Sequence, residues 1–544
     1  SKRFQYFYRE SHKMNDSSIK QFIEEGNLTI GIEFGSTRIK TVAIDDNCKT
    51  LATGTFGWEN TYQDGYWTYS MNDAWIGLQK SYSEMTKVIK EQYGSTVKKI
   101  KSLGISGMMH GYLVFDQKED LLVPFRTWRN NNANHAAQIL REAFQVNIPE
   151  RWSIAQLYQS AIDNESHVAK VDYMTTLAGY IHWYLTDEKV LGIGDASGMF
   201  PIDVETKEYR KDMAKKFNQL FSEVGYHQDI LEILPKVVVA GENAGYLTET
   251  GAKLIDPNGQ LEAGCPMCAP EADAATGMVA TNSVAPKTGN ISAGTSIFSM
   301  IVLDKPLKNV YPEVDIVTTP DGYEVAMIHA NNCTSDINAW VDLFGEVLEV
   351  MGFKYDKGEL FTKLFESALN GDDKLGNLLS YGYISGEFIT EVQQGYPMLV
   401  RSIDSSFNLA NVMKTHIYSA FSTLKIGIDL LKENEDIEIH SIYGHGGIFK
   451  TKKVAQTFLA AAMQSPVSVM QTASEGGAWG IAVLARYLVA ENDVNLSSYL
   501  NEIAFKDTDS IKIEPNEKEI ESFNRYIERF KKGLPIERLA NEQL

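Results

Sequence analysis

Two short segments of the chain have the residue types of a phosphate-binding turn. Gly35-Ser36-Thr37 and Gly294-Thr295-Ser296 each lie between two apolar runs, and the second run ends each time in an aspartate, Asp45 or Asp304. Glycine allows the backbone to approach a ligand closely, and turn amides together with hydroxyl groups can hold phosphate oxygens. Because the pattern occurs twice, we expect two strand–turn–strand hairpins, in two related lobes that bind one nucleotide.

A single hairpin of this kind is more often a plain turn than a ligand site. The matched flanking runs and the matched aspartates are what favour phosphate binding at both copies. Neither copy has the Gly-Lys-Ser/Thr ending of a P-loop, and neither is a dinucleotide-binding fingerprint. The nucleotide site would therefore be of another kind.

One aspartate stands where a helix is expected to begin. Asp273 lies in the segment Glu271-Ala272-Asp273-Ala274-Ala275, and an aspartate at a helix start commonly caps the helix. It can also act as a general base, because a sugar hydroxyl is a poor nucleophile and a nearby carboxylate can take its proton during phosphoryl transfer. The two interpretations are compatible.

Two glycine-rich turns follow later in the chain. Gly444, Gly446 and Gly447 stand between an expected strand and an expected helix, where bare backbone would let an adenosine lie close to helix amides. Glu475 begins a second small-residue turn that ends at Gly480. The alternatives are an ordinary loop for the first turn and close helix packing for the second.

Two further turns carry side chains suited to a sugar. Met109, His110 and Gly111 follow an apolar run, at a strand end of the kind where α/β folds place ligands. Trp128 and Asn130 combine an apolar ring face with a hydrogen-bonding amide, a pairing that commonly holds sugars. The alternatives are a histidine that is satisfied within the structure and a surface turn that its tryptophan anchors.

The composition excludes several classes of protein. A chain of 544 residues predicts two or more domains. Its net charge of −20 argues against nucleic acid or an anionic membrane as a partner. We find no signal peptide and no apolar run long enough to span a bilayer, so we expect a cytoplasmic protein. Cys265 and Cys268 have no second pair nearby, which favours apolar packing over zinc binding.

Apolar periodicity predicts the elements that must position these residues. Strands are expected at 28–34, 38–45, 50–58 and 437–443, and helices at 72–93, 132–144, 154–170, 173–185, 409–432, 452–463 and 475–489. Cys265–Cys268 is expected to end a strand, and Asp273–Ala280 is expected to open a helix. Strands that alternate with helices indicate α/β lobes.

In their order along the chain, these segments resemble the FGGY family of carbohydrate kinases, within the actin, hexokinase and Hsp70 fold group. The resemblance covers residues 28–500 and implies an α/β fold of two actin-like (ribonuclease H-like) lobes, with the active-site cleft between the lobes. It implies an N-terminal extension at 1–27, a sugar-binding lobe with the catalytic base at 28–285, an ATP-binding lobe at 286–500 and a helical tail at 501–544.

The resemblance also implies a role for each residue. ATP and Mg²⁺ are the implied cofactors, Asp273 is the implied base, and Glu33 and Asp273 help to hold the metal. The implied phosphate and nucleotide ligands are Gly35, Ser36, Thr37, Lys40, Gly294, Thr295, Ser296, Gly444, Gly446, Gly447 and Glu475. The implied sugar ligands are Met109, His110, Gly111, Trp128, Asn130 and Asp273.

Three departures from the family pattern leave the substrate open. Glu33 stands where the family usually has aspartate, Trp128-Arg129-Asn130 stands where xylulokinases have Trp-Asn-Asp, and Asn331-Asn332-Cys333 is unlike a standard pentulose kinase. We expect ATP-dependent phosphorylation of a ketopentose such as xylulose or ribulose. The alternatives are a kinase of another polyol or hydroxylated small molecule, and an ATP-hydrolysing regulator of the same fold group. The expected partner is a small-molecule sugar, and a homodimer is left open.

Overall fold

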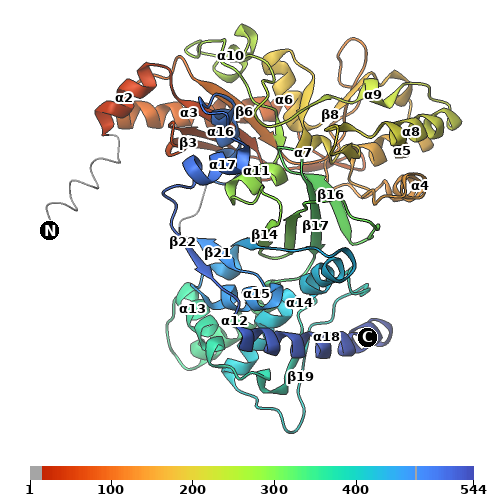
Figure 1. Ribbon diagram of the computed structural model, residues 1–544, viewed down its shortest axis with the longest axis vertical. Coiled ribbons are helices and arrows are strands. Elements are labelled where there is room, and N and C mark those ends of the chain that lie inside the picture. The colour runs from red at the N-terminus through yellow and green to blue at the C-terminus, as the bar shows by residue number, and fades with distance from the viewer. Residues whose placement is uncertain (1–14, 472–474) are drawn as a thin grey trace. The chain divides into compact units, whose positions relative to one another are not determined.

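The computed structural model describes residues 15–471 and 475–544 (Figure 1). The described chain forms two compact units, each assembled from three segments. Unit 1 contains residues 15–284, 317–323 and 475–507. Unit 2 contains residues 285–316, 324–471 and 508–544. The segment 475–507 therefore returns to unit 1 after most of unit 2 has been built.

Unit 1 is organised around a five-stranded sheet in the order β13-β6-β1-β2-β3. The strands are β1 (Thr29–Phe34), β2 (Arg38–Ile44), β3 (Thr50–Gly57), β6 (Ser102–Gly107) and β13 (Glu271–Ala272). β1, β2 and β3 form an antiparallel meander, whereas β6 runs parallel to β1 and β13 runs parallel to β6. The first predicted hairpin is therefore confirmed.

Helices and short strands surround this sheet. The helices are α2 (Asp16–Glu24), α3 (Met71–Tyr93), α4 (Asn134–Phe144), α5 (Ser153–Ile162), α6 (Leu177–Thr186), α7 (Ile193–Ala196), α8 (Lys211–Glu223), α9 (Ile230–Ile233), α10 (Glu249–Ile255), α11 (Asp273–Ala280), α16 (Gly476–Leu488) and α17 (Leu496–Tyr499). The short strands are β4 (Thr61–Gln63), β5 (Tyr66–Thr68), β7 (Leu113–Phe115), β8 (Tyr173–Thr175), β9 (Val190–Gly192), β10 (Ile202–Asp203), β11 (Glu208–Tyr209) and β12 (Lys236–Val238).

Two helices cover opposite faces of the unit 1 sheet, and glycines let them approach closely. A Cβ atom at Gly31 would lie 2.4 Å from the backbone of α16, and one at Gly54 would lie 1.9 Å from the backbone of α3. Gly31 pairs with Val42, and Val42 pairs with Thr53. Because successive residues of a strand face opposite sides, Gly54 faces away from Gly31. The sheet is thus buried on both sides, as the buried positions of β1 and β6 require.

Unit 2 contains a seven-stranded sheet in the order β16-β17-β15-β14-β20-β21-β22. The strands are β14 (Thr288–Ala293), β15 (Ile297–Val302), β16 (Val314–Thr318), β17 (Glu324–Ala330), β20 (Ser441–His445), β21 (Val467–Met470) and β22 (Ser510–Ile513). β14 and β15 form an antiparallel hairpin, which confirms the second predicted hairpin. β20 runs parallel to both β14 and β21.

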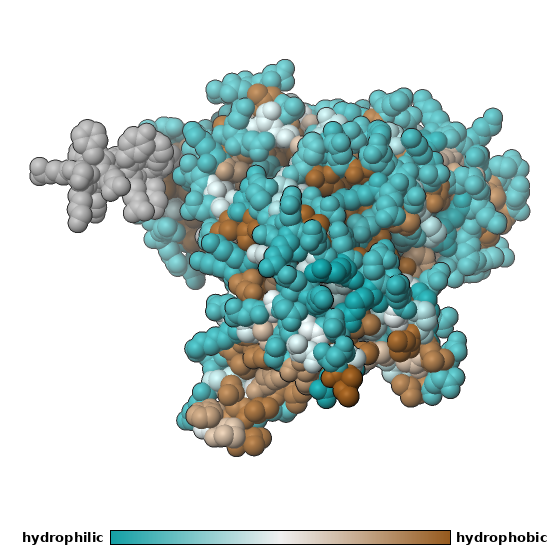
Figure 2. Space-filling model, turned by 60° about the horizontal axis from the view of Figure 1, so that its bottom comes forward, coloured by the Kyte–Doolittle hydropathy of each residue, from teal (hydrophilic) through white to brown (hydrophobic). Residues whose placement is uncertain are grey.

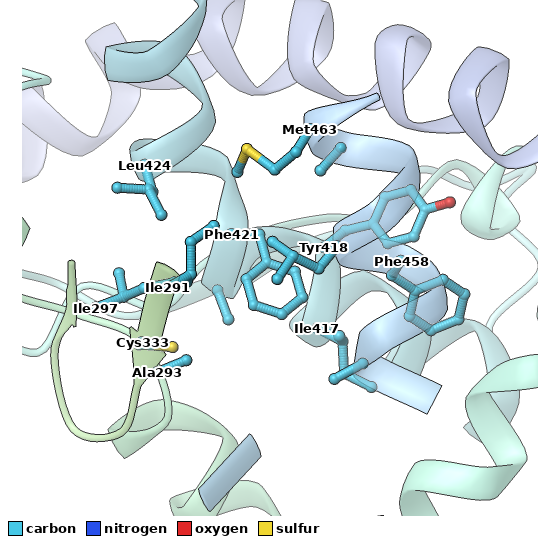
Figure 3. Packing of buried hydrophobic residues seen from close by; sticks show 14 of the residues in the cluster. Ile291, Ala293, Ile297, Cys333, Ile417, Tyr418, Phe421, Leu424, Phe458 and Met463 are labelled. Carbon is cyan, nitrogen blue, oxygen red and sulfur yellow. The ribbon is translucent and has the colours of Figure 1, made fainter. Parts of the chain in front are cut away.

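The core of unit 2 lies between this sheet and its helices. These are α12 (Ser335–Val350), α13 (Lys357–Ser367), α14 (Leu409–Glu435), α15 (Val454–Met463) and α18 (Glu517–Gln543), beside a small ladder of β18 (Leu379–Tyr381) and β19 (Met398–Val400). Ile291 and Ala293 of β14 pack in the same buried cluster as Ile417 and Phe421 of α14 (Figure 3). The hairpin that carries Gly294 is therefore anchored directly in the core.

The two units repeat one topology. In each unit three adjacent antiparallel strands (β1-β2-β3, or β14-β15-β17) precede a strand that is parallel to the first of the three, β6 or β20. Helix α3 comes before β6, whereas α12, α13 and α14 come before β20. Each parallel strand pairs on its other side with one more parallel strand, β13 or β21. The sequence repeat at Gly35 and Gly294 is thus the visible part of a repeat of the whole sheet.

Several predicted elements of unit 1 are wrong in detail. The single helix expected over 154–170 is shorter, because α5 ends at Ile162 and only a three-residue 3₁₀ turn follows at Val168–Lys170. The helix expected over 173–185 begins instead as strand β8, and α6 starts after Thr176, whose side chain accepts a hydrogen bond from the Gly179 amide. This side-chain cap sets the helix start.

Two further predictions need correction. The segment Cys265–Cys268 forms isolated bridges through Pro266 and Met267 rather than the end of a strand. The tail expected to be helical over 501–544 contains strand β22 before α18, and its first residues belong to unit 1.

One face of the molecule is mostly hydrophilic, with hydrophobic side chains gathered in separate patches (Figure 2).

Candidate active site

Two carboxylates of unit 1 stand at the ends of neighbouring strands. Glu33 is near the end of β1, and Asp273 follows β13, with β6 between these two strands. A Cβ atom at Gly477 would lie 1.6 Å from Glu33 Oε2. Gly477, in the first turn of α16, is therefore the residue whose missing side chain makes room for the Glu33 carboxylate.

Asp273 is the first residue of α11, while the N-cap position is held by Ala272. The capping interpretation of Asp273 is therefore wrong in this detail. Its Oδ1 accepts hydrogen bonds from the amides of Met109, at 3.1 Å, and Ala274, at 2.9 Å. Burial raises the pKa of Asp273 to about 6, against the opposing effect of these two hydrogen bonds. At neutral pH the group is a carboxylate that can accept a proton.

Burial and the charge of Asp273 together raise the pKa of Glu33 to about 8, while Lys40 opposes the rise. Two half-buried acidic groups, one of which raises the proton affinity of the other, are the oxygen ligands whose charge a divalent cation would neutralise, so these residues fit Mg²⁺. Within residues 15–471 and 475–544, no group of three or more His, Cys, Asp and Glu side chains is placed to hold a metal ion. Two carboxylates suffice for Mg²⁺, because this ion keeps several of its waters.

Lys40 and Glu475, both expected to bind nucleotide, form an ion pair with each other. Gly477 and Gly480 are packing positions: a Cβ atom at Gly480 would lie 2.3 Å from the carbonyl oxygen of Thr276 in α11. The close-packing alternative for the 475–480 turn is therefore confirmed. Nucleotide binding by Lys40 and Glu475 stays a prediction, and it would require their ion pair to break.

The predicted sugar turn is tightly built around His110. Its Nε2 accepts a hydrogen bond from Arg151 Nε, at 3.2 Å. Because arginine can only donate, the ring proton is on Nδ1, which donates to the Gly198 carbonyl oxygen at 3.2 Å. Burial and the charge of Arg151 lower the pKa of His110 to about 3, so the ring is neutral. Gly111 follows with a φ of 101°, a conformation that favours glycine.

Arg151 is the residue of this region that sequence reasoning missed. It reaches His110 from the segment just before α5, and no local motif marks it. Both His110 nitrogens are already bonded within the protein, so a direct sugar contact through the ring would displace one of these bonds. The structure thus favours a satisfied histidine that orients a guanidinium group.

Trp128 and Asn130 differ in accessibility. Trp128 is 41% exposed, whereas Asn130 is 8% exposed. Asn130 Oδ1 accepts from the Trp67 amide, and its Nδ2 donates to the carbonyl oxygens of Trp67 and Thr127. Both amide hydrogens are therefore used within the protein, one to fasten the loop to β5 and the other to Thr127 inside the loop. Sugar binding by Asn130 stays a prediction that could use only its remaining acceptor capacity.

The first predicted phosphate loop is held from behind by its carbonyl groups. The Gly35 carbonyl oxygen accepts from Trp58 Nε1 at 2.7 Å, and the Ser36 carbonyl oxygen accepts from the Tyr69 hydroxyl at 2.6 Å. In a planar trans peptide the carbonyl and the following amide point in opposite directions, and no described peptide bond is cis. The amides of Ser36 and Thr37 therefore point away from these two aromatic residues, as a phosphate site needs.

The second loop, in unit 2, repeats this arrangement. The Thr334 amide and hydroxyl both donate to the Gly294 carbonyl oxygen, at 3.1 and 2.7 Å. The Cys333 amide donates to the Thr295 carbonyl oxygen at 3.0 Å. By the same peptide geometry, the amides of Thr295 and Ser296 face away from segment 333–334. The sequence contained no signal for these holding contacts.

The predicted adenosine turn lies beside the second phosphate loop. Gly444 belongs to β20, and Gly446 has a φ of 114°. A Cβ atom at Gly446 would lie 2.2 Å from the carbonyl oxygen of Ala293, the last residue of β14. Only glycine permits this approach, so the turn at Gly446 and Gly447 is brought against the end of the strand that leads into Gly294.

Family comparisons agree with this geometry. Residues 28–279 match the N-terminal domain, and residues 289–489 the C-terminal domain, of the FGGY family of carbohydrate kinases. The chain belongs to the FGGY family. It is 22% identical over 518 residues to the xylulose kinase of Haemophilus influenzae, an alignment that covers 92% of this chain and 98% of that protein.

Solved structures show the same fold. The ligand-bound xylulose kinase of Lactobacillus acidophilus superposes with a TM-score of 0.75 at 16% identity, over 93% of this chain and 97% of that one. A gluconate kinase of the same organism superposes with a TM-score of 0.74 at 16% identity, over the same shares of the two chains. The prediction of an α/β fold with two actin-like lobes is confirmed, and the FGGY protein is a carbohydrate kinase whose family implies ATP as phosphate donor. The cleft between the lobes stays a prediction.

Across the part of the chain that the structure describes, no helix combines the length and the apolar character that crossing a bilayer would require.

Proposed function

We propose that this FGGY kinase transfers the γ-phosphoryl group of ATP to a hydroxyl of a ketopentose such as xylulose or ribulose. The observation that carries the proposal is the Asp273 carboxylate, which the Met109 amide fixes beside the His110 turn. A base in this position takes the proton of the sugar hydroxyl while the new oxygen–phosphorus bond forms and the bond to the β-phosphate oxygen breaks.

The remaining residues serve binding and charge. The amides and hydroxyls of Ser36 and Thr37, and those of Thr295 and Ser296, hold phosphate oxygens. The turn at Gly446 and Gly447 accepts the adenosine. Glu33 and Asp273 hold Mg²⁺, which when bound neutralises charge on the transferring phosphates.

A second candidate substrate is a sugar acid. The guanidinium of Arg151, oriented by His110, would recognise a carboxylate better than a neutral hydroxyl. The similar fold of a gluconate kinase shows that this architecture occurs in a protein named for such a substrate. Ketopentoses remain the first candidate, because the relative aligned over nearly the whole chain is a xylulose kinase.

The test is a screen of ketopentoses, ketohexoses, alditols and aldonic acids, with ADP release and the phosphorylated product measured separately. We expect ADP to form with one ketopentose and to match the phosphosugar in amount. ADP without a phosphorylated product would overturn the proposal and favour the ATP-hydrolysing alternative. Arg151→Lys distinguishes the two substrate classes, since it should weaken an aldonate about tenfold or more while changing a ketose less.

A further inference from the structure

The second phosphate loop is linked to a distant helix through one asparagine. Asn332 directly precedes the two residues that hold the carbonyls of Gly294 and Thr295. Its Oδ1 accepts from the amides of Ile384 and Ser385, at 2.8 and 3.0 Å. Asn332 is 7% exposed, so these bonds are sheltered from water and fix its position.

Asn332 also forms hydrogen bonds with the buried carboxylate of Glu387, in the loop that begins at Ile384. Glu387 Oε1 accepts from the Asn332 backbone amide at 2.7 Å and from its Nδ2 at 2.8 Å. Glu387 is 2% exposed, and its own backbone pairs with Val392. Residues 384–396 thus form a loop that this pairing closes, and its first residues are fastened to the segment behind the phosphate loop.

Helix α18 holds the other end of this loop through one turn of side chains. Glu537 Oε1 accepts from the Tyr396 amide at 2.7 Å. Arg538 donates through Nε and Nη2 to the Thr390 carbonyl oxygen, at 3.2 and 2.8 Å. Asn541 Oδ1 accepts from the Gln394 amide. Three successive contacts from positions 537, 538 and 541 leave this stretch little freedom.

The contacts extend without a gap from α18 to the phosphate loop, all within unit 2. They pass from α18 to residues 390–396, then through the backbone pairing of Val392 with Glu387 to Asn332. From Asn332 they continue along the chain to Cys333, whose amide bonds to Thr295 (Figure 3 shows Cys333 beside Ala293 of the hairpin). α18 lies beyond residues 289–489, which the C-terminal family domain matches. In this protein, helix α18, which lies outside the matched domain, therefore supports the second phosphate loop, which lies inside it.

We propose that Asn332 and helix α18 are positioning elements for the second phosphate loop, and that they set how tightly ATP phosphates bind there. The proposal rests on the proposed kinase function for the identity of the ligand. α18 touches no phosphate itself. It limits the movement of the 384–396 loop, and that loop in turn limits the movement of the backbone that orients the Thr295 and Ser296 amides.

The test compares three variants on α18 in the full-length protein. Asn541→Leu removes the acceptor for the Gln394 amide, whereas Asn541→Asp keeps an acceptor oxygen there. Glu528→Gln, at an exposed position whose carboxylate pairs only with Lys531 among the ion pairs of the described chain, is the matched control. Thermal unfolding of each variant shows whether it is folded before the comparison is made.

We expect Asn541→Leu to raise KM for ATP several-fold to tenfold, with KM for the sugar unchanged, and Asn541→Asp to recover most of the loss. Hydrogen exchange of the peptide that spans 288–302 should be several-fold faster in Asn541→Leu and unchanged in Glu528→Gln. This second measurement does not depend on turnover. Absence of phosphosugar from the parent protein would refute the kinase function alone, whereas unchanged exchange in Asn541→Leu would overturn the role of α18.

Discussion

At the scale of single residues, the reaction depends on two acidic groups whose surroundings differ. Asp273 accepts two backbone hydrogen bonds, which limit the rise of its pKa to about 6. For Glu33 the charge of Lys40 limits the rise, and its pKa is about 8. Two carboxyl groups with separated pKa values can take different roles in one site. We assign proton transfer to Asp273 and metal binding mainly to Glu33.

Asp273→Asn tests the first assignment. Asparagine keeps an oxygen for the Met109 and Ala274 amides but cannot accept the hydroxyl proton. We expect kcat to fall about 10² to 10⁴-fold, the usual share of general-base catalysis, with ADP affinity little changed. Steady-state kinetics and calorimetric titration of ADP measure the two quantities. Turnover close to that of the parent protein would remove Asp273 from the mechanism.

Substitutions of Glu33 test the second assignment. Glu33→Gln removes the charge at constant size and should weaken metal-dependent turnover strongly, because Mg²⁺ prefers charged oxygen ligands. Glu33→Asp should keep substantial activity, since it restores the residue that the family usually has. Titration of Mg²⁺ and Mn²⁺ against phosphosugar formation gives the comparison. If Glu33→Gln matches the parent at limiting metal, the group does not handle the ion.

At the scale of elements, α16 and α18 act on the site from outside the sheets. α16 packs against β1 and β6 through glycines, and it provides the space for the Glu33 carboxylate. α18 fastens the 384–396 loop. Both helices come late in the chain. They determine local positions in the site that the phosphate-loop motifs at Gly35 and Gly294 do not determine by themselves.

Gly477→Ala tests the role of α16. The new methyl group would lie 1.6 Å from Glu33 Oε2 and 2.8 Å from the Thr276 hydroxyl, so the carboxylate must move. We expect a large loss of kcat with a smaller loss of stability, because one side chain can shift more easily than the helix can. Gly277→Ala, inside helix α11, where φ is not positive and a Cβ meets nothing within 4 Å, controls for the addition of a methyl group to a helical glycine. Equal effects of both substitutions would speak against a specific contact with Glu33.

Glu537 gives α18 a pH dependence. Its side chain is fully buried, its Oε2 has no hydrogen-bond partner, and burial raises its pKa to about 7. The folded state thus binds a proton more tightly than the unfolded state, so this stabilising contribution is present below about pH 4.5 and is lost as pH rises through 7. The Tm of Glu537→Gln relative to the parent should therefore increase from pH 5 to pH 8. A constant difference across that range would contradict the prediction.

The sequence predicted much of the framework, because strong local patterns determine it. The two hairpins, the start of α11 at Asp273 and the long helices α3 and α14 follow from apolar periodicity and turn residues. It failed where tertiary contacts decide the outcome. Arg151 reaches His110 across the fold, and both amide hydrogens of Asn130 are taken by the carbonyl oxygens of Trp67 and Thr127.

At the scale of the whole molecule, each unit has a separate hydrophobic core. Because the predicted adenosine turn at Gly446 and one of the two predicted phosphate loops belong to unit 2, ADP should stabilise mainly that unit. At 100 times its Kd, a ligand stabilises the folded state by about 2.7 kcal/mol. Scanning calorimetry should show two transitions, of which ADP raises one by about 5 °C or more. An equal shift of both transitions would mean that the units unfold together or that ADP contacts both.

The order of segments also has a consequence for synthesis of the protein. The face of β1 and β6 that α16 covers is made early, but α16 follows about 180 residues of unit 2. Until α16 has been synthesised, the apolar face of β1 and β6 is not covered. The helix that lies against the Glu33 carboxylate is also missing. The nascent chain is therefore prone to aggregation during most of its translation, and we expect chaperones to bind it. The part of the site around Glu33 can be complete only once α16 has been made, at residue 488 of 544.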